Sequence, residues 1–276
     1  MKRTIYSKYY SDTFLYNHLL VSNNTSFNRE LHTHAEYEIL YLKSGKLQYI
    51  EDSSLYNVTS DSLILTRPGK LHSVSFEGTS YDRYDILFDV SELNLSILNK
   101  IPDKLTVISC ESYPNLSSLF EKMDLFFTHF AEDELYNILH CLVEELFYTI
   151  IAYGIKPDEN DESMIYYSTL TKAISYIDTN IAGDLSLDII CEHLHITKSY
   201  LHRIFMEKLH VSPKKYINIK RFSQAQNAIR LGSNPTAIYS QLGFSDYSTF
   251  FRGYKKHYGY SPSEEYLHTA SLSSMS

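Results

Sequence analysis

The chain has 276 residues, of which 43% are hydrophobic and 21% are charged, and its formal net charge is −8. This length gives room for two domains with separate cores, and the composition is ordinary for a soluble protein. The negative net charge disfavours a protein that binds DNA over its whole length.

The number and spacing of the cysteines and the shortness of the apolar runs disfavour secretion and membrane spanning. Cys110, Cys141 and Cys191 show no Cys-X-X-Cys spacing and form an odd number, which argues against disulfides and against a cysteine-rich zinc site. No run approaches 18 apolar residues, and the first residues, MKRTIYSKYYSD, lack the apolar core of a signal peptide. We therefore expect a cytoplasmic protein.

Short alternating segments predict strands between residues 36 and 89. The expected strands include residues 37–41, 47–49, 63–65, 74–76 and 84–88. Ser44-Gly45 is expected to turn the chain, and Arg67-Pro68-Gly69 to interrupt it. Many short strands at regular spacing predict a β-sandwich or β-barrel.

A group of histidines and one glutamate stands out within these strands. His32, His34 and Glu38 differ by even numbers, so on a strand they project from one face, and His72 follows later. The spacing of the first three residues, with Gly45 after them, resembles the first motif of cupin barrels, and Pro68 to His72 resembles the second. In metal-binding cupins the equivalent residues hold a divalent metal, and imidazole with carboxylate suits Zn, Fe or Mn.

Two helices with apolar stripes are predicted between Leu116 and Tyr153. The stripes comprise Leu116, Leu119, Phe120, Met123 and Phe127, and then Leu135, Ile138, Leu139, Leu142, Leu146 and Ile150. These helices either pack on the outside of the barrel or pair in a homodimer. Because both carry many aromatic and aliphatic residues, we expect them to do both in part. The polar, acidic segment that follows, up to Glu162, reads as an interdomain linker.

The charge divides at this linker. Residues 163–276 carry 12 Lys and Arg against 8 Asp and Glu, a net charge of +4. Residues 1–162 carry 13 against 25, a net charge of −12. The basic excess therefore lies in the second half, which can approach DNA, whereas the acidic half is expected to face a ligand or another subunit.

The basic half contains one short pattern twice, at residues 192–203 and 241–252, each reading as a helix, a tight turn and a second helix. In the first copy Thr197 is expected to cap the second helix. The two second helices carry matching exposed faces, offset by 49 residues: Ser199 with Ser248, His202 with Phe251, and Arg203 with Arg252. An exposed face that ends in Arg suits base edges or phosphates. Two such units on one block suit two successive major grooves.

A helix is predicted between the two copies, from Ser212 to Leu231, with Pro213 in its first turn. At 1.5 Å per residue it forms a rod of about 30 Å. This length is close to one DNA turn of about 34 Å. Near the end of the chain, Ser261 and Glu264 form a capping box around Pro262.

The stretch from Ser163 to His268 resembles the DNA-binding domain of AraC/XylS-type transcriptional regulators. The residues that carry the resemblance are Arg221-Phe222, Ala225, Gly243-Phe244-Ser245-Asp246, Phe250, Arg252, Tyr254-Lys255-Lys256 and Gly259-Tyr260-Ser261-Pro262. The resemblance implies that DNA is contacted by Ser199, Tyr200, His202, Arg203, Tyr247, Ser248, Thr249, Phe251, Arg252 and Lys255. The chain departs from the pattern at Cys191, His210, Pro235 and Tyr239, and the changes at Pro235 and Tyr239 indicate a repacked second unit.

The same resemblance bears on the first half. Sensor domains of this family are often cupins that keep such histidines without metal, so we expect His32, His34, Glu38 and His72 to line a pocket for a small ligand. A divalent metal in the barrel stays the alternative. The resemblance also favours dimerisation through the two helices.

The sequence therefore predicts an α+β multidomain protein. Residues 1–112 form a cupin-like β-barrel with an N-terminal arm, residues 113–154 dimerisation helices, residues 155–162 a linker, and residues 163–268 an all-α domain with two helix-turn-helix units. The predicted protein is not an enzyme but a cytoplasmic, homodimeric transcriptional regulator, classed as an activator. It binds double-stranded DNA, RNA polymerase and a small effector such as a sugar.

Two other functions are compatible with the pattern. A cupin metalloenzyme with a helical appendage would hold stoichiometric metal on His32, His34, Glu38 and His72 and would turn over a substrate. An interaction module that does not bind DNA would show no salt-dependent binding to a duplex.

Overall fold

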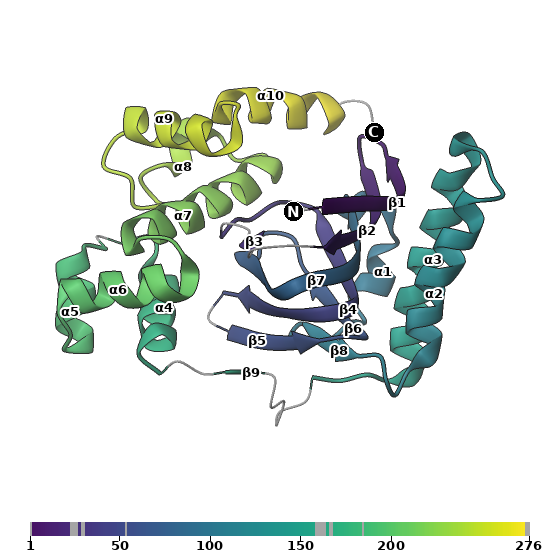
Figure 1. Ribbon diagram of the computed structural model, residues 1–276. Helices are drawn as coiled ribbons and strands as arrows, with labels where there is room; N and C mark the ends of the chain where they lie inside the picture. The colour runs from purple at the N-terminus through teal and green to yellow at the C-terminus, as the bar shows by residue number, and fades with distance from the viewer. Residues whose placement is uncertain are drawn as a thin grey trace.

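The computed structural model describes residues 2–22, 27–28, 31–52, 54–157, 164–165, 168–183 and 185–273. A curved antiparallel sheet occupies the middle of the molecule, two long helices cover one side of it, and further helices lie on the other side (Figure 1). The chain thus forms the predicted N-terminal sheet domain and helical C-terminal domain. Residues 158–162 of the predicted linker lie outside the described residues.

The sheet folds over on itself. Its strands are β1 (Lys2–Tyr10), β2 (Phe14–Ser22), β3 (Phe27–Asn28), β4 (Tyr37–Glu51), β5 (Ser54–Thr59), β6 (Ser62–Thr66), β7 (His72–Phe88), β8 (Val107–Ser109) and β9 (Met164–Ile165). They pair in the order β1-β2-β7-β4-β5-β9, with β3 beside β7 and β6 between β4 and β8. Residues 38–42 of β4 pair with β6, whereas residues 46–51 pair with β5. Both halves of β4 contribute to one enclosed core, which includes Leu40, Leu42, Leu47 and Tyr49.

The strands differ from the prediction in two places. Ser44-Gly45 does not turn the chain, because β4 continues through it and only the register with β7 shifts. Gly45 has a φ of +114°, and a Cβ atom there would lie 2.8 Å from Cβ of Tyr81, so glycine is required for a bulge. The N-terminal arm, for which the pattern predicts no strand, forms the hairpin β1-β2, because β2 pairs along β7.

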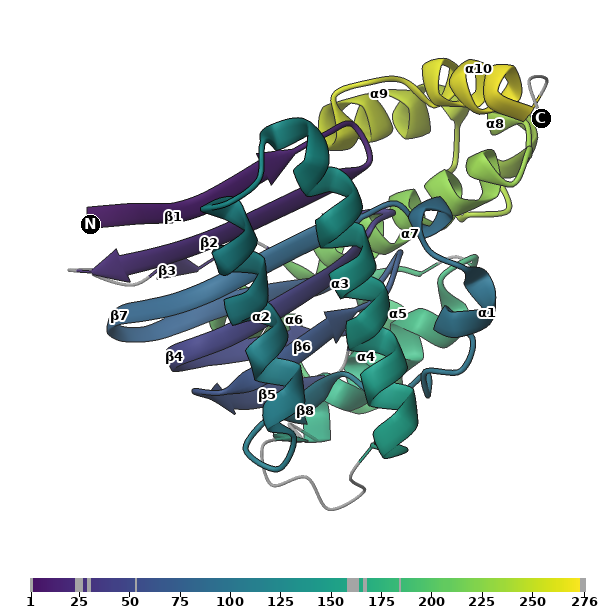
Figure 2. The ribbon, with the colours of Figure 1, turned by 90° about the vertical axis from the view of Figure 1, so that its right-hand side faces the viewer.

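The outer face of the sheet is covered by α2 (Pro114–Phe127) and α3 (Glu132–Tyr153), which cross the strands (Figure 2). The short elements η1 (Val90–Glu92) and α1 (Leu95–Leu98) precede them. The predicted stripes of both helices are largely buried in one core with the sheet. By length and composition, α3 is the one helix among the described residues that could cross a membrane, but its apolar stripe is part of this core.

The C-terminal domain consists of α4 (Ser168–Asn180), α5 (Leu187–Leu194), α6 (Lys198–Leu209), α7 (Pro213–Arg230), α8 (Pro235–Ile238), α9 (Tyr247–Tyr258) and α10 (Pro262–Ser273). The long helix α7 contributes to two cores: one with α4, α5 and α6, and one with α8, α9 and α10. The predicted caps are confirmed at Thr197 and Ser261, and Ser212 caps α7 in the same way. In contrast, α8 has only four residues, so the first helix of the second unit is shorter than that of the first.

Candidate functional site

The first predicted recognition face lies on α6. The Thr197 hydroxyl accepts a hydrogen bond from the Tyr200 amide at 3.2 Å, and this cap fixes where the helix starts. Leu201 and Phe205 are buried in the core around α7. Ser199, His202 and Arg203 are exposed on the opposite side, and Tyr200 is half-buried. The Arg203 guanidinium lies 5.2 Å from the centre of the Tyr200 ring, within reach of a cation–π contact.

The second recognition face lies on α9, where Phe250 and Tyr254 are buried. Ser248, Thr249, Arg252 and Lys255 are exposed, whereas Tyr247 and Phe251 are half-buried. Two of these residues have structural partners. The Thr249 hydroxyl and amide both donate to the capping residue Asp246, and the Tyr247 ring packs against Tyr239. The side chains that face solvent without such a role are therefore Ser248, Arg252 and Lys255.

The helix α7 holds both helix pairs in place. Its Arg221 side chain is buried and donates hydrogen bonds to three backbone carbonyls, those of Ile181, Gly183 and Gly243. The first two lie before α5, and the third lies in the turn before α9. A Cβ atom at Gly243 would lie 2.4 Å from the guanidinium, so glycine at this turn leaves room for Arg221. One side chain thus links the connection between α4 and α5 to the turn before α9.

The four candidate ligand residues of the sheet domain lie together. Nε2 of His34 and Nε2 of His72 are each 3.0 Å from Oε2 of Glu38. His32 joins them through a β-bridge with His72, and one ligand atom from each of the four lies within 4.8 Å of the others. Burial opposes ionisation of Glu38, but hydrogen bonds from His34 and His72 outweigh it and hold the pKa of this carboxyl well below its usual range.

A pocket of about 260 Å³ adjoins this cluster through Glu38. It lies between β1, β2 and β7, and its polar or aromatic lining consists of Arg3, Asn17, Glu38, Tyr81, Arg83 and Asp85. Nε of Arg83 is 3.2 Å from Oδ2 of Asp85, and the guanidinium lies 4.8 Å from the centre of the Phe76 ring. Donors and acceptors therefore line one small space, as in sites that bind small polar molecules.

The sequence pattern does not single out this pocket, although it carries a signal. Arg83 and Asp85 are two residues apart, so they share one face of β7 with Tyr81, while Tyr84, Ile86 and Phe88 form the apolar opposite face. Charged residues on the inner face of a strand indicate a pocket. Asn17 and Arg3 complete the pocket because they lie on the hairpin β1-β2, which the sequence pattern does not predict.

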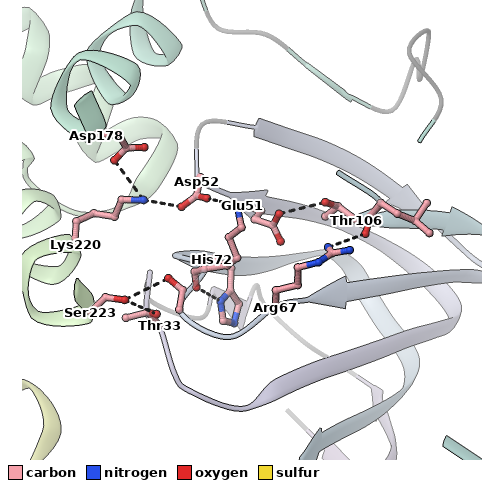
Figure 3. Close-up of polar contacts among 12 residues, drawn as sticks. Thr33, Glu51, Asp52, Arg67, His72, Thr106, Asp178, Lys220 and Ser223 are labelled. Carbon is pink, nitrogen blue, oxygen red and sulfur yellow. Dashed lines mark hydrogen bonds and ion pairs between the residues drawn. The ribbon is translucent and has the colours of Figure 1, made fainter. Parts of the chain in front are cut away.

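The two domains meet beside the histidine cluster (Figure 3). Nζ of Lys220 on α7 lies 2.8 Å from Oδ1 of Asp52 in the sheet domain and 3.3 Å from Oδ1 of Asp178 on α4. The Ser223 hydroxyl lies 3.4 Å from the Thr33 hydroxyl and donates to the carbonyl of Gly69 at 3.3 Å. We call these contacts the domain seam.

Both domains match models of known protein families. A model of the AraC-like ligand binding domain matches residues 19–139, and a model of a helix-turn-helix domain matches residues 190–266. The chain belongs to the AraC family. AraC-type domains of these two kinds make it a ligand-responsive transcriptional regulator, in which the first domain implies a small-molecule effector and the second implies DNA.

Several relatives match this chain at low identity, and one of them matches most of its length. YfiF, an uncharacterised helix-turn-helix transcriptional regulator of Bacillus subtilis, is 24% identical over 245 residues, which are 85% of this chain and 78% of the relative. The lactose operon transcription activator of Staphylococcus xylosus is 30% identical over 101 residues, 36% of each protein. The Msm operon regulatory protein of Streptococcus mutans is 30% identical over 135 residues, 48% of this chain and 45% of the relative.

Among solved structures, apo ToxT of Vibrio cholerae matches with a TM-score of 0.41 and 17% identity, over 94% of this chain and 98% of that one. The AraC-like transcriptional activator CuxR matches with a TM-score of 0.42 and 16% identity, over 82% and 81%.

Proposed function

We propose that the two helix pairs read two successive major grooves of a specific DNA site. The observation that supports this most directly is the pair of solvent-facing surfaces on α6 and α9, each with an exposed arginine, on opposite ends of one rigid helix. An 18-residue α7 is about 27 Å long. This length approaches the spacing of about 34 Å between successive major grooves.

Changing Arg203 or Arg252 to Ala tests this proposal. The DNA that the protein retains from its own genome is sequenced, and affinity is measured for that site and for a scrambled duplex. Each substitution is expected to cost about 1–3 kcal/mol on the specific site if the arginine reads a base. Lys100→Ala, which removes an exposed charge from the sheet domain, is the matched control. Equal affinity of both variants and wild type would contradict the proposal, and equal loss on both duplexes would reduce the arginine to a phosphate contact.

The effector in our proposal binds in the pocket beside Glu38. The pocket supplies guanidinium and amide donors, carboxylate acceptors and one aromatic ring, which suits a small molecule with several hydroxyl groups, such as a sugar. The names of the lactose and raffinose regulators among the relatives agree with this class. A promoter response that persists unchanged in both Asn17→Ala and His34→Ala variants would contradict this assignment.

The response would follow from a shift in population between two placements of the domains. An effector acts only if it binds one placement more tightly than the other. Because the domain seam joins α7 to the segments around Thr33 and Gly69, a change at the pocket can favour one placement. In this proposal, residues 1–112 form the sensor, residues 113–154 the dimerising helices and residues 163–268 the domain that reads DNA.

The regulator acts in the cytoplasm as a homodimer, contacts RNA polymerase as an activator and controls uptake or metabolism of its effector. It has no enzymatic activity of its own. A cupin metalloenzyme is the second candidate, favoured only by the four converging side chains, and turnover of a substrate in the absence of DNA would establish it.

A further inference from the structure

The charged side chains of the pocket beside Glu38 follow one another along β7. Tyr81, Arg83 and Asp85 are two residues apart, so their side chains share the inner face of this strand. Glu38 reaches the same pocket from β4, where it pairs with Leu87, two residues beyond Asp85. The positive charge of Arg83 therefore lies toward one end of the pocket, and the carboxylates lie toward the other end.

Arg3 joins the positive end from the edge of the sheet. Val21 on β2 pairs with Tyr81 on one side and with Arg3 on the other, so Arg3 and Tyr81 lie in one row across β1, β2 and β7 (Figure 2). Burial raises the pKa of the Tyr81 hydroxyl, and the positive charges of Arg83 and then Arg3 oppose this rise, each more strongly than Asp85 adds to it. The two guanidinium groups thus dominate the electric field at this hydroxyl.

The Arg83 guanidinium is held in place by the protein itself. Its Nε lies 3.2 Å from Oδ2 of Asp85, and the guanidinium carbon lies 4.8 Å and 5.7 Å from the centres of the Phe76 and Tyr81 rings. These two rings stack on each other with their centroids 3.6 Å apart. Because the side chain is already positioned, a ligand that binds its terminal nitrogens does not have to order it.

Two neutral polar groups face the same space. Tyr81 is only 2% exposed, yet within the described part of the chain its hydroxyl makes no hydrogen bond, and neither does the side-chain amide of Asn17. A buried hydroxyl without a partner costs free energy unless water or a ligand supplies the partner. A ligand oxygen beside Tyr81 would accept from the hydroxyl and from a guanidinium group together.

We propose that the effector carries one anionic group, a carboxylate or a phosphate ester, which binds between Arg3, Tyr81 and Arg83. Guanidinium groups bind both kinds of anion through paired, charge-assisted hydrogen bonds. Hydroxyl groups of the same molecule donate to the carboxylates of Asp85 and Glu38 at the other end of the pocket. This inference rests on the proposed function, which places the effector here, and it narrows the effector from sugars in general to an acidic or phosphorylated sugar.

Titration with isolated chemical groups tests the anion site. The full chain is titrated calorimetrically with sodium acetate, inorganic phosphate and glycerol at constant ionic strength, because salt screens exposed charges. We expect acetate or phosphate to bind at one site per chain in the millimolar range, and glycerol to bind more weakly than either of them. The anion that binds more tightly identifies the charged group of the effector as a carboxylate or a phosphate ester.

Three variants locate the bound anion. Tyr81→Phe keeps the ring stack and removes only the hydroxyl, so it is expected to weaken anion binding about tenfold. Arg3→Gln removes a charge from the exposed rim and is expected to weaken binding about threefold. Lys2→Gln removes the same charge from the neighbouring residue of β1, whose side chain lies on the opposite face of the strand, and it should bind as wild type does.

Three results would overturn the anion site. They are glycerol that binds as tightly as both anions, anions that do not bind in the millimolar range, and an anion affinity that is the same in wild type, Tyr81→Phe and Arg3→Gln. No titration contains DNA, so a chain that binds anions in this pocket but binds no specific DNA would contradict the proposed function alone. A chain that binds specific DNA but no anion would contradict this inference alone.

Discussion

Arg221 illustrates how a single side chain can join the two halves of the helical domain. Its guanidinium is buried and satisfies three carbonyls that come from two different turns. A buried carbonyl that loses its partner costs about 1–3 kcal/mol. Arginine presents its donors in a fixed planar fork, so lysine cannot replace all three contacts.

Arg221→Ala is expected to destabilise the helical domain by about 3 kcal/mol, because one buried and two partly buried hydrogen bonds are lost together. Arg221→Lys is expected to recover only part of this loss. Urea unfolding measures the stability of both variants. Arg252→Ala removes an exposed arginine from α9 and is the control, so it should leave the unfolding midpoint unchanged. A wild-type midpoint for Arg221→Ala would contradict this role.

His18 is a second residue whose surroundings decide its chemistry. Its Nε2 lies 2.9 Å from Oδ1 of Asp82, and its Nδ1 lies 2.7 Å from Oδ2 of Asp124 on α2. Burial lowers the pKa of His18, but the two carboxylates outweigh burial and raise it. Burial likewise raises the pKa of Asp124, but hydrogen bonds from His18, Ser7 and Tyr84 outweigh it and lower it.

These shifts predict a pH dependence of stability. The contribution of His18 is complete below its ordinary pKa of about 6.5 and is lost as pH rises through the higher folded value. The contribution of Asp124 is present above about pH 3.9 and is lost as pH falls through the lower folded value. The thermal midpoint of wild type should therefore fall as pH rises above about 6.5, and more steeply than that of His18→Gln. Parallel pH profiles of the two proteins would refute this.

At the scale of elements, the position of α3 changes the interpretation of its apolar stripe. Leu135, Leu139, Leu142, Leu146 and Ile150 are buried within the monomer, so they cannot form a dimer interface. The exposed apolar residues of the two helices lie on another face. Lys122 and Glu145 form an ion pair across α2 and α3 at 3.1 Å. Leu125 and Tyr148, each three residues further along its helix, are 54% and 52% exposed on the same side.

If α2 and α3 dimerise, they do so through this exposed face. The double substitution Leu125→Glu and Tyr148→Glu is expected to give a folded monomer, whereas Leu139→Glu is expected to unfold the domain because it buries a charge. Light scattering with circular dichroism distinguishes the two results. A double variant that stays dimeric would exclude this face.

The elements also show which features can be predicted from the sequence. Thr197 and Ser261 cap their helices as predicted, because a cap depends on residues three positions apart. The exposed faces of α6 and α9 follow from helical periodicity. The shortening of α8 is anticipated only by the unusual Pro235 and Tyr239.

Long-range contacts are harder to predict. The pocket around Arg83 and the domain seam depend on pairings between β2 and β7 and between α7 and the sheet domain, which no local pattern specifies. The bulge at Gly45 has the same origin, because only the approach of Tyr81 distinguishes it from a turn. His32, His34, Glu38 and His72 can be grouped from the sequence because a recognisable spacing connects them, and in the structure one ligand atom from each lies within 4.8 Å of the others.

At the scale of the whole molecule, the sheet domain and the helical domain pack against each other at the domain seam. Leu31, Ile50, Leu55 and Leu71 of the sheet domain are part of the same apolar core as α4 to α7. Lys220 adds an ion pair to Asp52 across the boundary, in a partly buried position. The segments that carry the histidine cluster are therefore joined directly to α7 through Thr33 and Gly69, as the proposed response to an effector requires.

The spacing between the two grooves tests the central claim most directly. If α7 holds α6 and α9 at a fixed separation, the protected site should cover two successive major grooves on one side of the duplex, about 10 base pairs apart. Inserting about five base pairs between the two half-sites turns them to opposite sides of the DNA and should reduce binding to the level of scrambled DNA. Footprinting with quantitative binding measures both. Unchanged affinity for the spaced site would contradict reading by two rigidly linked units.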